Sequence, residues 1–323
     1  MLQQVKEKRP EIPLLLVAPN GNIDDYLNIQ HHYEDSLSNA IAENAYDALK
    51  AKGVNDIYLL DNNSIKLNIN SLADSTDLND IGMQQYANAV EKIIRKVLDE
   101  PTGTASTTHP RTQKRDANLY NWEIRHRYIL NRVKQNQPKV IFIGNSITHY
   151  WGGLPHGPIK SAWDAPNPFF DSLDAEDLGY GWDRIENVLW RIYHGELDGY
   201  KARQAVLLIG TNNLDVNTNA EILEGLKFVV NAIKMHQPGC KILMLGLTPR
   251  RGYEKRIAEL NQGVAKLAGL MNVNYADAGG LFLKPDGKID ESLFSDGLHP
   301  TAKGYKMLEN FLRPYVTQNY EVK

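Results

Sequence analysis

The chain has 323 residues, of which 42% are hydrophobic, enough apolar material for more than one domain. Its net charge of -3 and its isoelectric point near 6.3 give no electrostatic reason to expect a nucleic-acid partner. A single cysteine, Cys240, excludes an internal disulfide.

No apolar run approaches the roughly 18 residues of a membrane span, so we expect no membrane span. The opening M-L-Q-Q-V-K-E-K also lacks the apolar stretch of a signal peptide. As written, the sequence therefore predicts a cytoplasmic protein. A periplasmic or secreted protein is expected instead if the true N-terminus lies upstream.

Residues 1–100 predict a small α/β unit. The apolar run P-L-L-L-V-A-P indicates a strand, an Asn- and Ala-rich stretch that ends at Gly53 indicates a helix, and D-I-Y-L-L-D indicates a second strand. A further helix is expected after D-S-T-D-L-N-D. Residues 101–118 are polar, small and interrupted by proline, which is typical of a linker.

Residues 119–323 predict a second, larger α/β domain. The stretch K-V-I-F-I-G-N-S indicates a buried strand that ends on Ser146. Thr218 with Glu221 has the spacing of a capping box for the helix that follows. The expected strands cover 139–144, a segment near 169–178, 205–210, 241–247 and 273–277, and the expected helices cover 185–193, 220–236, 254–270 and 302–315.

Three residues of this domain suit nucleophilic catalysis. A serine hydroxyl needs a general base, and that base needs an orienting partner. Ser146 follows a strand, and Asp296 and His299 stand three positions apart in S-D-G-L-H-P. Alone, Asp296 could cap a helix and His299 could be a surface turn residue. A metal site made by His149, His299 and Asp296 is a further alternative, but no typical metal-ligand spacing supports it.

Together, four blocks resemble the SGNH hydrolases, also called GDSL esterases and lipases. The blocks are G-N-S at Ser146, the G-Y-G-W-D loop, G-T-N-N at Asn212 and D-G-L-H-P. The short motifs V-L-W-R, G-E-L and G-L-x-P-R are most similar to those of the catalytic subunits of intracellular platelet-activating-factor acetylhydrolases and their bacterial relatives. The resemblance covers roughly residues 119–316. It implies a doubly wound, flavodoxin-like sheet of five parallel strands with helices on both faces.

The resemblance also implies an oxyanion hole. Its donors would be the backbone N–H of Ser146, a backbone N–H from the glycine block, and the side-chain amide of Asn212. Trp182 stands where the family has a glycine, so either Gly181 or Trp182 supplies the second donor. The usual G-D-S is G-N-S here. Asp183 with Glu186 is expected to cap the next helix, which would place its positive end near the oxyanion.

The first 100 residues repeat the order of the last strand, helix, strand and helix of the catalytic domain. In this alignment, Asp74 corresponds to Asp296 and Asp77 to His299. We therefore interpret residues 1–100 as a partial, degenerate SGNH-type half-domain without an active site; a chance similarity is the alternative. Because a half-sheet exposes edge strands and an apolar face, it should dock on the catalytic domain, on its missing half or on a partner, including a second copy of the chain.

The expected activity is that of a serine esterase that cleaves small acyl esters, acetyl esters first, with a carbohydrate or similar polar alcohol. His149, Tyr150 and Trp151 follow the nucleophile and are expected to line the substrate pocket. No cofactor and no metal is expected. A catalytically weak binding or scaffold protein and an O-acetyltransferase that uses the same serine are the alternatives.

Overall fold

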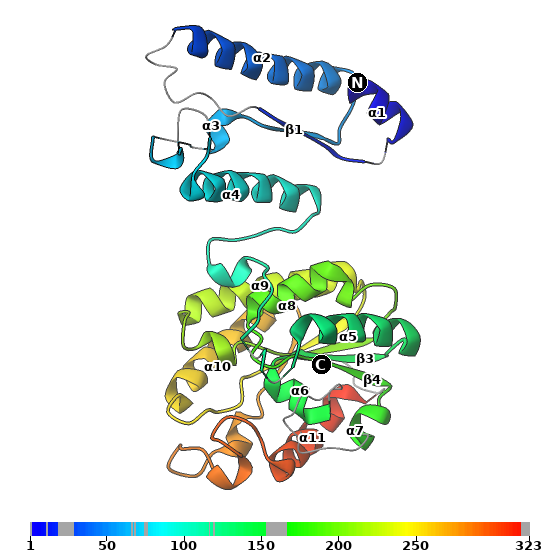
Figure 1. Cartoon of the computed structure of the whole chain (residues 1–323). Helices are drawn as coiled ribbons and strands as arrows, with labels where there is room; N and C mark the ends of the chain where they lie inside the picture. The colour runs from blue at the N-terminus through cyan, green and yellow to red at the C-terminus, as the bar shows by residue number, and fades with distance from the viewer. Residues whose placement is uncertain are drawn as a thin grey trace. The chain divides into compact units, whose positions relative to one another are not determined.

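The structure is a computed structural model, and it describes residues 2–10, 12–18, 29–65, 67, 69–73, 77–115, 117–118, 120–152 and 167–317. The chain divides into two compact units, Met1–Pro101 and Thr102–Lys323 (Figure 1). No helix among the described residues is long and apolar enough to cross a membrane.

The second unit is built on a five-stranded parallel sheet. Its strand order is β4-β3-β5-β6-β7, which is the predicted doubly wound, flavodoxin-like arrangement. Strand β3 lies between β4 and β5 and is parallel to both. The C-terminal ends of these three strands therefore lie at the same edge of the sheet. The strands are β3 (Val140–Gly144), β4 (Ala175–Gly179), β5 (Gln204–Leu208), β6 (Lys241–Leu245) and β7 (Asn274–Ala276).

Helices cover both faces of this sheet, as predicted. In Figure 1, α6, α7 and α11 lie on one face, and α5, α8, α9 and α10 lie on the other. All five residues of β3 are buried, which explains the continuous apolar run in the sequence. The helices are α5 (Trp122–Asn136), α6 (Ser146–Gly152), α7 (Pro168–Asp171), α8 (Ile185–Arg191), α9 (Asn219–His236), α10 (Glu254–Leu270) and α11 (Ala302–Val316).

Helix boundaries follow local capping. Thr218 caps α9 with Glu221 as predicted, since the N–H of Glu221 donates to Thr218 Oγ1 at 3.3 Å and the N–H of Thr218 donates to Glu221 Oε2 at 2.7 Å. Helix α8 continues into a π-turn over Ile192–Glu196. Short 3₁₀ turns lie at Ser106–Thr108, Thr211–Asn213, Gly279–Phe282 and Glu291–Leu293.

The segment predicted as a linker is packed on the second unit. The unit begins at Thr102. Thr107 is fully buried, and its hydroxyl donates to the carbonyl of Glu221 at 2.6 Å, while the N–H of Thr104 donates to Glu224 at 3.0 Å. The expectation of a separate connector over 101–118 is therefore wrong, because these small polar side chains bind α9 instead of solvent.

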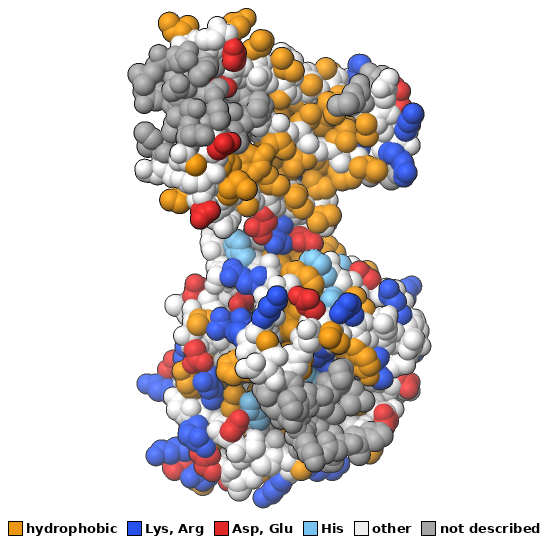
Figure 2. All heavy atoms as spheres, in the orientation of Figure 1, with side chains coloured by type: hydrophobic (Ala, Val, Ile, Leu, Met, Phe, Trp, Pro, Cys, Tyr) orange, Lys and Arg blue, Asp and Glu red, His pale blue; other side chains and the backbone are white. Residues whose placement is uncertain are grey.

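The first unit has the predicted order of strand, helix, strand and helix. Strand β1 (Leu14–Val17) pairs in parallel with β2 (Ile57–Leu60), and the long helices are α2 (Ile29–Ala51) and α4 (Asp80–Val97). Shorter helical segments are α1 (Leu2–Lys8), α3 (Asn62–Ile65) and a 3₁₀ turn at Ile69–Ser71. Figure 2 shows hydrophobic side chains gathered across much of this unit.

A turn in the first unit shares a backbone hydrogen bond and a closing bridge with the turn that carries Asp296 and His299. The N–H of Ala73 donates to the carbonyl of Asp77 at 2.7 Å, as the N–H of Ser295 donates to that of His299 at 2.9 Å. Each turn is closed by an antiparallel bridge, Leu72 with Leu78 and Phe294 with Pro300. Asp77 thus lies where His299 lies in the second unit. Asp74 is outside the described residues.

Two glycines allow α6 to lie directly against the sheet. A Cβ atom on Gly144 would lie 2.0 Å from Thr148 Oγ1, and one on Gly179 would lie 2.3 Å from the backbone nitrogen of His149. Helix α6 begins at Ser146, so this close approach fixes where the serine stands above the strand ends.

We predict that Gly179→Ala destabilises the protein by about 1–3 kcal/mol, because the α6 backbone would have to move away from β4. Urea unfolding measures this loss. Gly269→Ala in α10 is the matched control, since a Cβ there meets nothing within 4 Å. That variant should keep or gain stability, by at most about 1 kcal/mol. Equal losses in both variants would contradict the tight contact of α6 with the sheet.

Candidate active site

Ser146, His299 and Asp296 form a connected set at the C-terminal edge of the sheet. His299 Nε2 lies 2.8 Å from Ser146 Oγ, and His299 Nδ1 lies 2.7 Å from Asp296 Oδ2. Asp296 Oδ1 also accepts the backbone N–H of His299 at 2.8 Å. Partial burial raises the pKa of Asp296, but these hydrogen bonds from His299 outweigh it, so the pKa lies below its ordinary value. The carboxylate is therefore charged at neutral pH and can orient the imidazole.

Ser146 is the first residue of α6, and Asn145 caps this helix. Asn145 Oδ1 accepts the N–H of Ile147 at 3.0 Å. An amide oxygen serves this purpose as well as a carboxylate oxygen does, which accounts for G-N-S in place of G-D-S. As the first residue of the helix, Ser146 has no acceptor within α6 for its own N–H.

The loop from Gly181 to Asp183 lies between β4 and α8, beside the serine. The N–H of Gly181 donates to His149 Nδ1 at 3.3 Å. The N–H of Trp182 has no acceptor within the described part of the chain, and Trp182 has a positive φ of 62°. Of the two candidate donors in this loop, Trp182 is thus the one whose N–H is available.

Asn212 lies in the 3₁₀ turn that follows β5. Its side-chain nitrogen donates to the carbonyl of Asp183 at 2.9 Å, and an amide nitrogen carries a second hydrogen that can bind another acceptor. Its neighbour Asn213 has a different set of contacts. Asn213 Nδ2 donates to Glu186 at 3.0 Å, and Asn213 Oδ1 accepts the N–H of Ile185 at 3.1 Å.

Asp183 does not cap α8, so the predicted capping box with Glu186 is wrong. The N–H of Arg184 is instead accepted by Asn187 Oδ1 at 2.9 Å. The carboxylate of Asp183 is fully buried, and accepts hydrogen bonds from Trp122 Nε1 at 2.7 Å and Arg191 Nε at 2.9 Å. Burial raises its pKa to about 6, against the opposing effects of these donors. It is therefore mostly charged at pH 7.

Residues before β3 hold the same loop, and sequence reasoning missed them. Gln113 Nε2 donates to the carbonyl of Gly181 at 3.0 Å and to Asp183 Oδ1 at 3.1 Å. The hydroxyl of Tyr120 also donates to the carbonyl of Gly181, at 2.8 Å. Arg115 donates to the carbonyl of Trp182 at 3.0 Å. The polar character of this segment could have indicated hydrogen bonding, but not its target.

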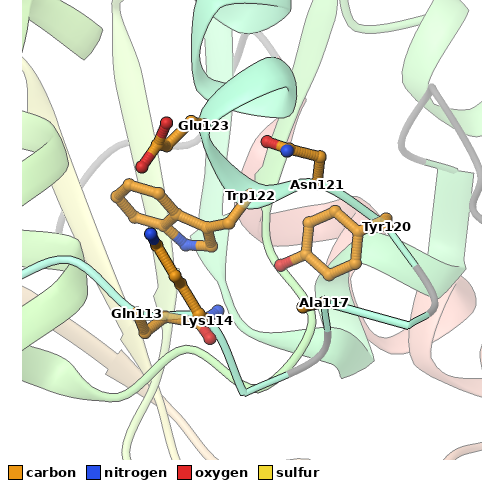
Figure 3. A pocket seen from close by; sticks show the side chains of 7 residues that line it. All are labelled: Gln113, Lys114, Ala117, Tyr120, Asn121, Trp122 and Glu123. Carbon is orange, nitrogen blue, oxygen red and sulfur yellow. The ribbon is translucent and has the colours of Figure 1, made fainter.

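A pocket of about 160 Å³ lies beside these residues, apart from the serine (Figure 3). Its lining does not include Ser146, Asp296 or His299. The Trp122 indole forms one wall of it, and the same indole binds Asp183. The lining residues are Gln113, Lys114, Ala117, Tyr120, Asn121, Trp122 and Glu123. Three of these lining residues, Gln113, Tyr120 and Trp122, also bind the loop from Gly181 to Asp183.

The three residues predicted to line the substrate pocket have different positions. Trp151 is 1% exposed and stacks between Phe169 and Tyr305, so it is a core residue and its assignment to the pocket is wrong. His149 is buried and binds Gly181. Tyr150 is partly buried, and its ring centroid lies 4.9 Å from that of His299, so of the three it is the one that lies beside His299.

The metal alternative involved the same histidines. Among the residues that the structure describes, no group of three or more His, Cys, Asp and Glu side chains could hold a metal ion. His149 directs Nδ1 at the N–H of Gly181, whereas His299 is held between Asp296 and Ser146.

Comparison with known proteins identifies the family. Residues 142–307 match a model of the GDSL-like lipase/acylhydrolase family, and residues 1–95 match a second model with the same description. The human platelet-activating factor acetylhydrolase IB subunit alpha2 is 31% identical over 205 residues, which is 62% of this chain and 85% of the human protein. The bovine subunit alpha1 is 29% identical over 205 residues, which is 61% of this chain and 84% of the bovine protein.

A solved structure gives the same fold. A GDSL-like lipase from Bacteroides thetaiotaomicron superposes with a TM-score of 0.50 at 16% sequence identity, over 61% of this chain and 97% of that chain. The chain therefore belongs to the GDSL-like lipase/acylhydrolase family of carboxylic ester hydrolases.

Proposed function

We propose that the protein is a serine esterase that cleaves small acyl esters, acetyl esters first, through an acyl-enzyme. The observation that carries the proposal is the continuous hydrogen-bonded series from Asp296 through His299 to Ser146. In that series, each residue has the partner that its role in nucleophilic catalysis requires.

In the first half-reaction, Ser146 Oγ attacks the acyl carbon and its proton passes to His299 Nε2. Asp296 stabilises the imidazolium that forms. The tetrahedral intermediate then breaks its bond to the alcohol oxygen, which takes the proton from His299. In the second half-reaction, water attacks the acyl-serine with the same proton transfers and releases the carboxylic acid. One ester and one water give one acid and one alcohol.

The negative oxygen of each intermediate is stabilised by three donors in this proposal. They are the backbone N–H of Ser146, the backbone N–H of Trp182 and the side-chain amide of Asn212. Gly181 is not among them, because its N–H is bound to His149. The donors come from three segments that the sheet brings to one edge, so they are in place before the substrate arrives.

Preference for a short acyl group is supported by the relatives. The mammalian proteins that resemble the chain are named as acetylhydrolases. For the alcohol, we favour a carbohydrate or similar polar alcohol, which suits exposed aromatic surface near the nucleophile. An acyl transfer to another alcohol uses the same acyl-enzyme, and analysis of the products distinguishes it from hydrolysis.

We further infer that the first unit is a partial SGNH-type domain without a catalytic site. Its turn shares a backbone hydrogen bond and a closing bridge with the Asp296–His299 turn, and Asp77 lies in the place of the histidine. A carboxylate at that place cannot replace the histidine, because at neutral pH it is a much weaker general base than an imidazole.

The central prediction is that Ser146 is acylated during turnover. A serine-directed fluorophosphonate should label Ser146 in the wild type, and p-nitrophenyl acetate hydrolysis should stop in Ser146→Ala. Mass spectrometry of the labelled peptide identifies the residue. Labelling that persists in Ser146→Ala, or undiminished hydrolysis by that variant, would contradict the proposal. An inert wild type that still folds would favour a binding or scaffold protein.

The two neighbouring asparagines provide a test of the oxyanion hole. We expect Asn212→Ala to lower kcat by about 100- to 1000-fold, since its amide stabilises the transition state. Asn213→Ala is the control, because it removes hydrogen bonds to Glu186 and the α8 backbone, and should lower Tm with a smaller effect on kcat. If Asn213→Ala had the larger effect on kcat, the role assigned to Asn212 would be wrong.

The two equivalent turns provide another comparison. His299→Ala removes the base and should reduce kcat/KM by several decades, leaving the residual activity of the oxyanion hole. Asp77→Ala should leave kcat/KM unchanged, because its turn serves no chemistry. The value of kcat/KM is measured for both variants with the same ester, and their Tm values are measured to verify that both are folded. Equal losses would show that the first unit takes part in catalysis.

A further inference from the structure

Trp182 has an unfavourable backbone conformation for a residue with a Cβ atom. Its φ of 62° lies in the left-handed region, which glycine adopts freely and a large side chain does not. Backbone strain of this kind persists at positions where the side chain or the backbone has a functional role. A glycine would supply the same backbone N–H without the strain, so any functional gain from tryptophan at this position comes from its indole.

The indole does not hold the loop in place. The loop is fixed by Gln113 and Tyr120 at the carbonyl of Gly181, by Arg115 at the carbonyl of Trp182, and by Arg191 at Asp183. The side chain of Trp182 is 50% exposed, and no other aromatic ring among the described residues stacks on it. A large apolar surface is therefore left open one residue away from the buried Asp183.

Polar and charged side chains follow the neighbouring strand ends. Arg184, two residues after Trp182, donates to the carbonyl of Asn212 at 3.0 Å. Asp215, which follows β5, accepts hydrogen bonds from Arg250 at 3.0 Å and from Tyr253. Arg250 lies 4.4 Å over the Tyr253 ring. We call Asp215, Arg250 and Tyr253 the polar rim. Because Arg184 binds the carbonyl of Asn212, three residues before Asp215, the loop and the rim both lie at the C-terminal end of β5.

We propose that Trp182 and the polar rim form the subsite for the alcohol half of the ester, and that this alcohol is a pyranose sugar. The inference rests on the proposed esterase function and names its substrate class. The apolar C–H face of a pyranose ring packs on an indole, while its ring hydroxyls need donors and acceptors at the edge. Arg250 supplies donors, Asp215 supplies acceptors, and Tyr253 can supply both.

An alkyl alcohol fits this subsite poorly. A chain of methylene groups would pack on the indole, but it would also remove water from Arg250 and Asp215 without replacing their hydrogen bonds. Sugar hydroxyls replace those hydrogen bonds. The charged rim therefore favours the sugar over the lipid alcohol, although the indole alone would accept either.

The test uses Trp182→Gly, which keeps the backbone N–H and relieves the strain. The substrates are an acetylated methyl pyranoside, triacetin, which is an acyclic acetyl ester, and hexyl acetate. We expect kcat/KM for the pyranoside to fall about tenfold or more relative to kcat/KM for triacetin, because only the pyranose ring packs on the indole. Tm should not fall, because glycine adopts this φ freely. Trp182→Phe should restore most of the affinity.

A direct binding measurement separates this inference from the esterase function. In Ser146→Ala, which cannot turn the ester over, the pyranoside should quench tryptophan fluorescence on titration, and the quenching should be lost in Ser146→Ala with Trp182→Gly. Binding of this kind without turnover in the wild type would refute the esterase function alone. Equal losses for pyranoside and triacetin, a selective loss for hexyl acetate, or absence of pyranoside binding would overturn the subsite.

The polar rim is tested with two arginine variants. Arg250→Gln breaks the ion pair with Asp215, and should raise KM for the pyranoside with little change for triacetin. Arg132→Gln is the matched control, because Arg132 pairs with Glu176 at 2.7 Å near the start of β4, at the opposite end of the strands. It should leave both substrates unchanged. Equal effects of the two variants would remove Arg250 from the subsite.

Discussion

The loop from Gly181 to Asp183 depends on the contacts of the buried carboxylate of Asp183. A charge that is removed from water must be matched by donors, and Asp183 has them from Arg191, Trp122 and Gln113. Because these donors come from α8, α5 and the segment before α5, the loop cannot move without leaving a buried charge unpaired. Together with the hydrogen bond from Arg115 to the carbonyl of Trp182, these contacts hold the backbone of the loop in place.

The positions of the donors explain why the loop tolerates a tryptophan. In this loop the fold fixes the backbone through carbonyl and carboxylate oxygens, not through the side chain at 182. Arg115, Gln113 and Tyr120 bind these oxygens. A side chain at 182 is consequently not needed for packing. A residue that is not needed for packing can change to suit the substrate, at the expense of local backbone strain.

The sheet order and the Ser146, His299 and Asp296 set were accessible from the sequence. Strand apolarity and the positions of polar residues at strand ends follow from burial and from the rule that parallel strands present their ligands at one edge. The sequence did not reveal that Asp183 is a buried hydrogen-bond acceptor. The D-x-x-E spacing is typical of a helix cap, but it also occurs by chance where no cap forms. Residues 101–118 were assigned to a linker because their composition is polar. Composition does not reveal that Thr107 is buried against α9.

The two equivalent turns show that a site depends on elements that are distant from the turn in the sequence. Each turn has the same backbone hydrogen bond and the same closing bridge, yet the helices that follow have different surroundings. Met83 in α4 is 60% exposed, whereas Tyr305 at the matching place in α11 is 1% exposed, and donates to the carbonyl of Ile147 at 2.8 Å. Helix α6, which covers Tyr305, is also the helix that begins at Ser146. The same packing that buries α11 therefore places Ser146 beside His299, and the backbone hydrogen bond of the turn alone does not bring a serine to it.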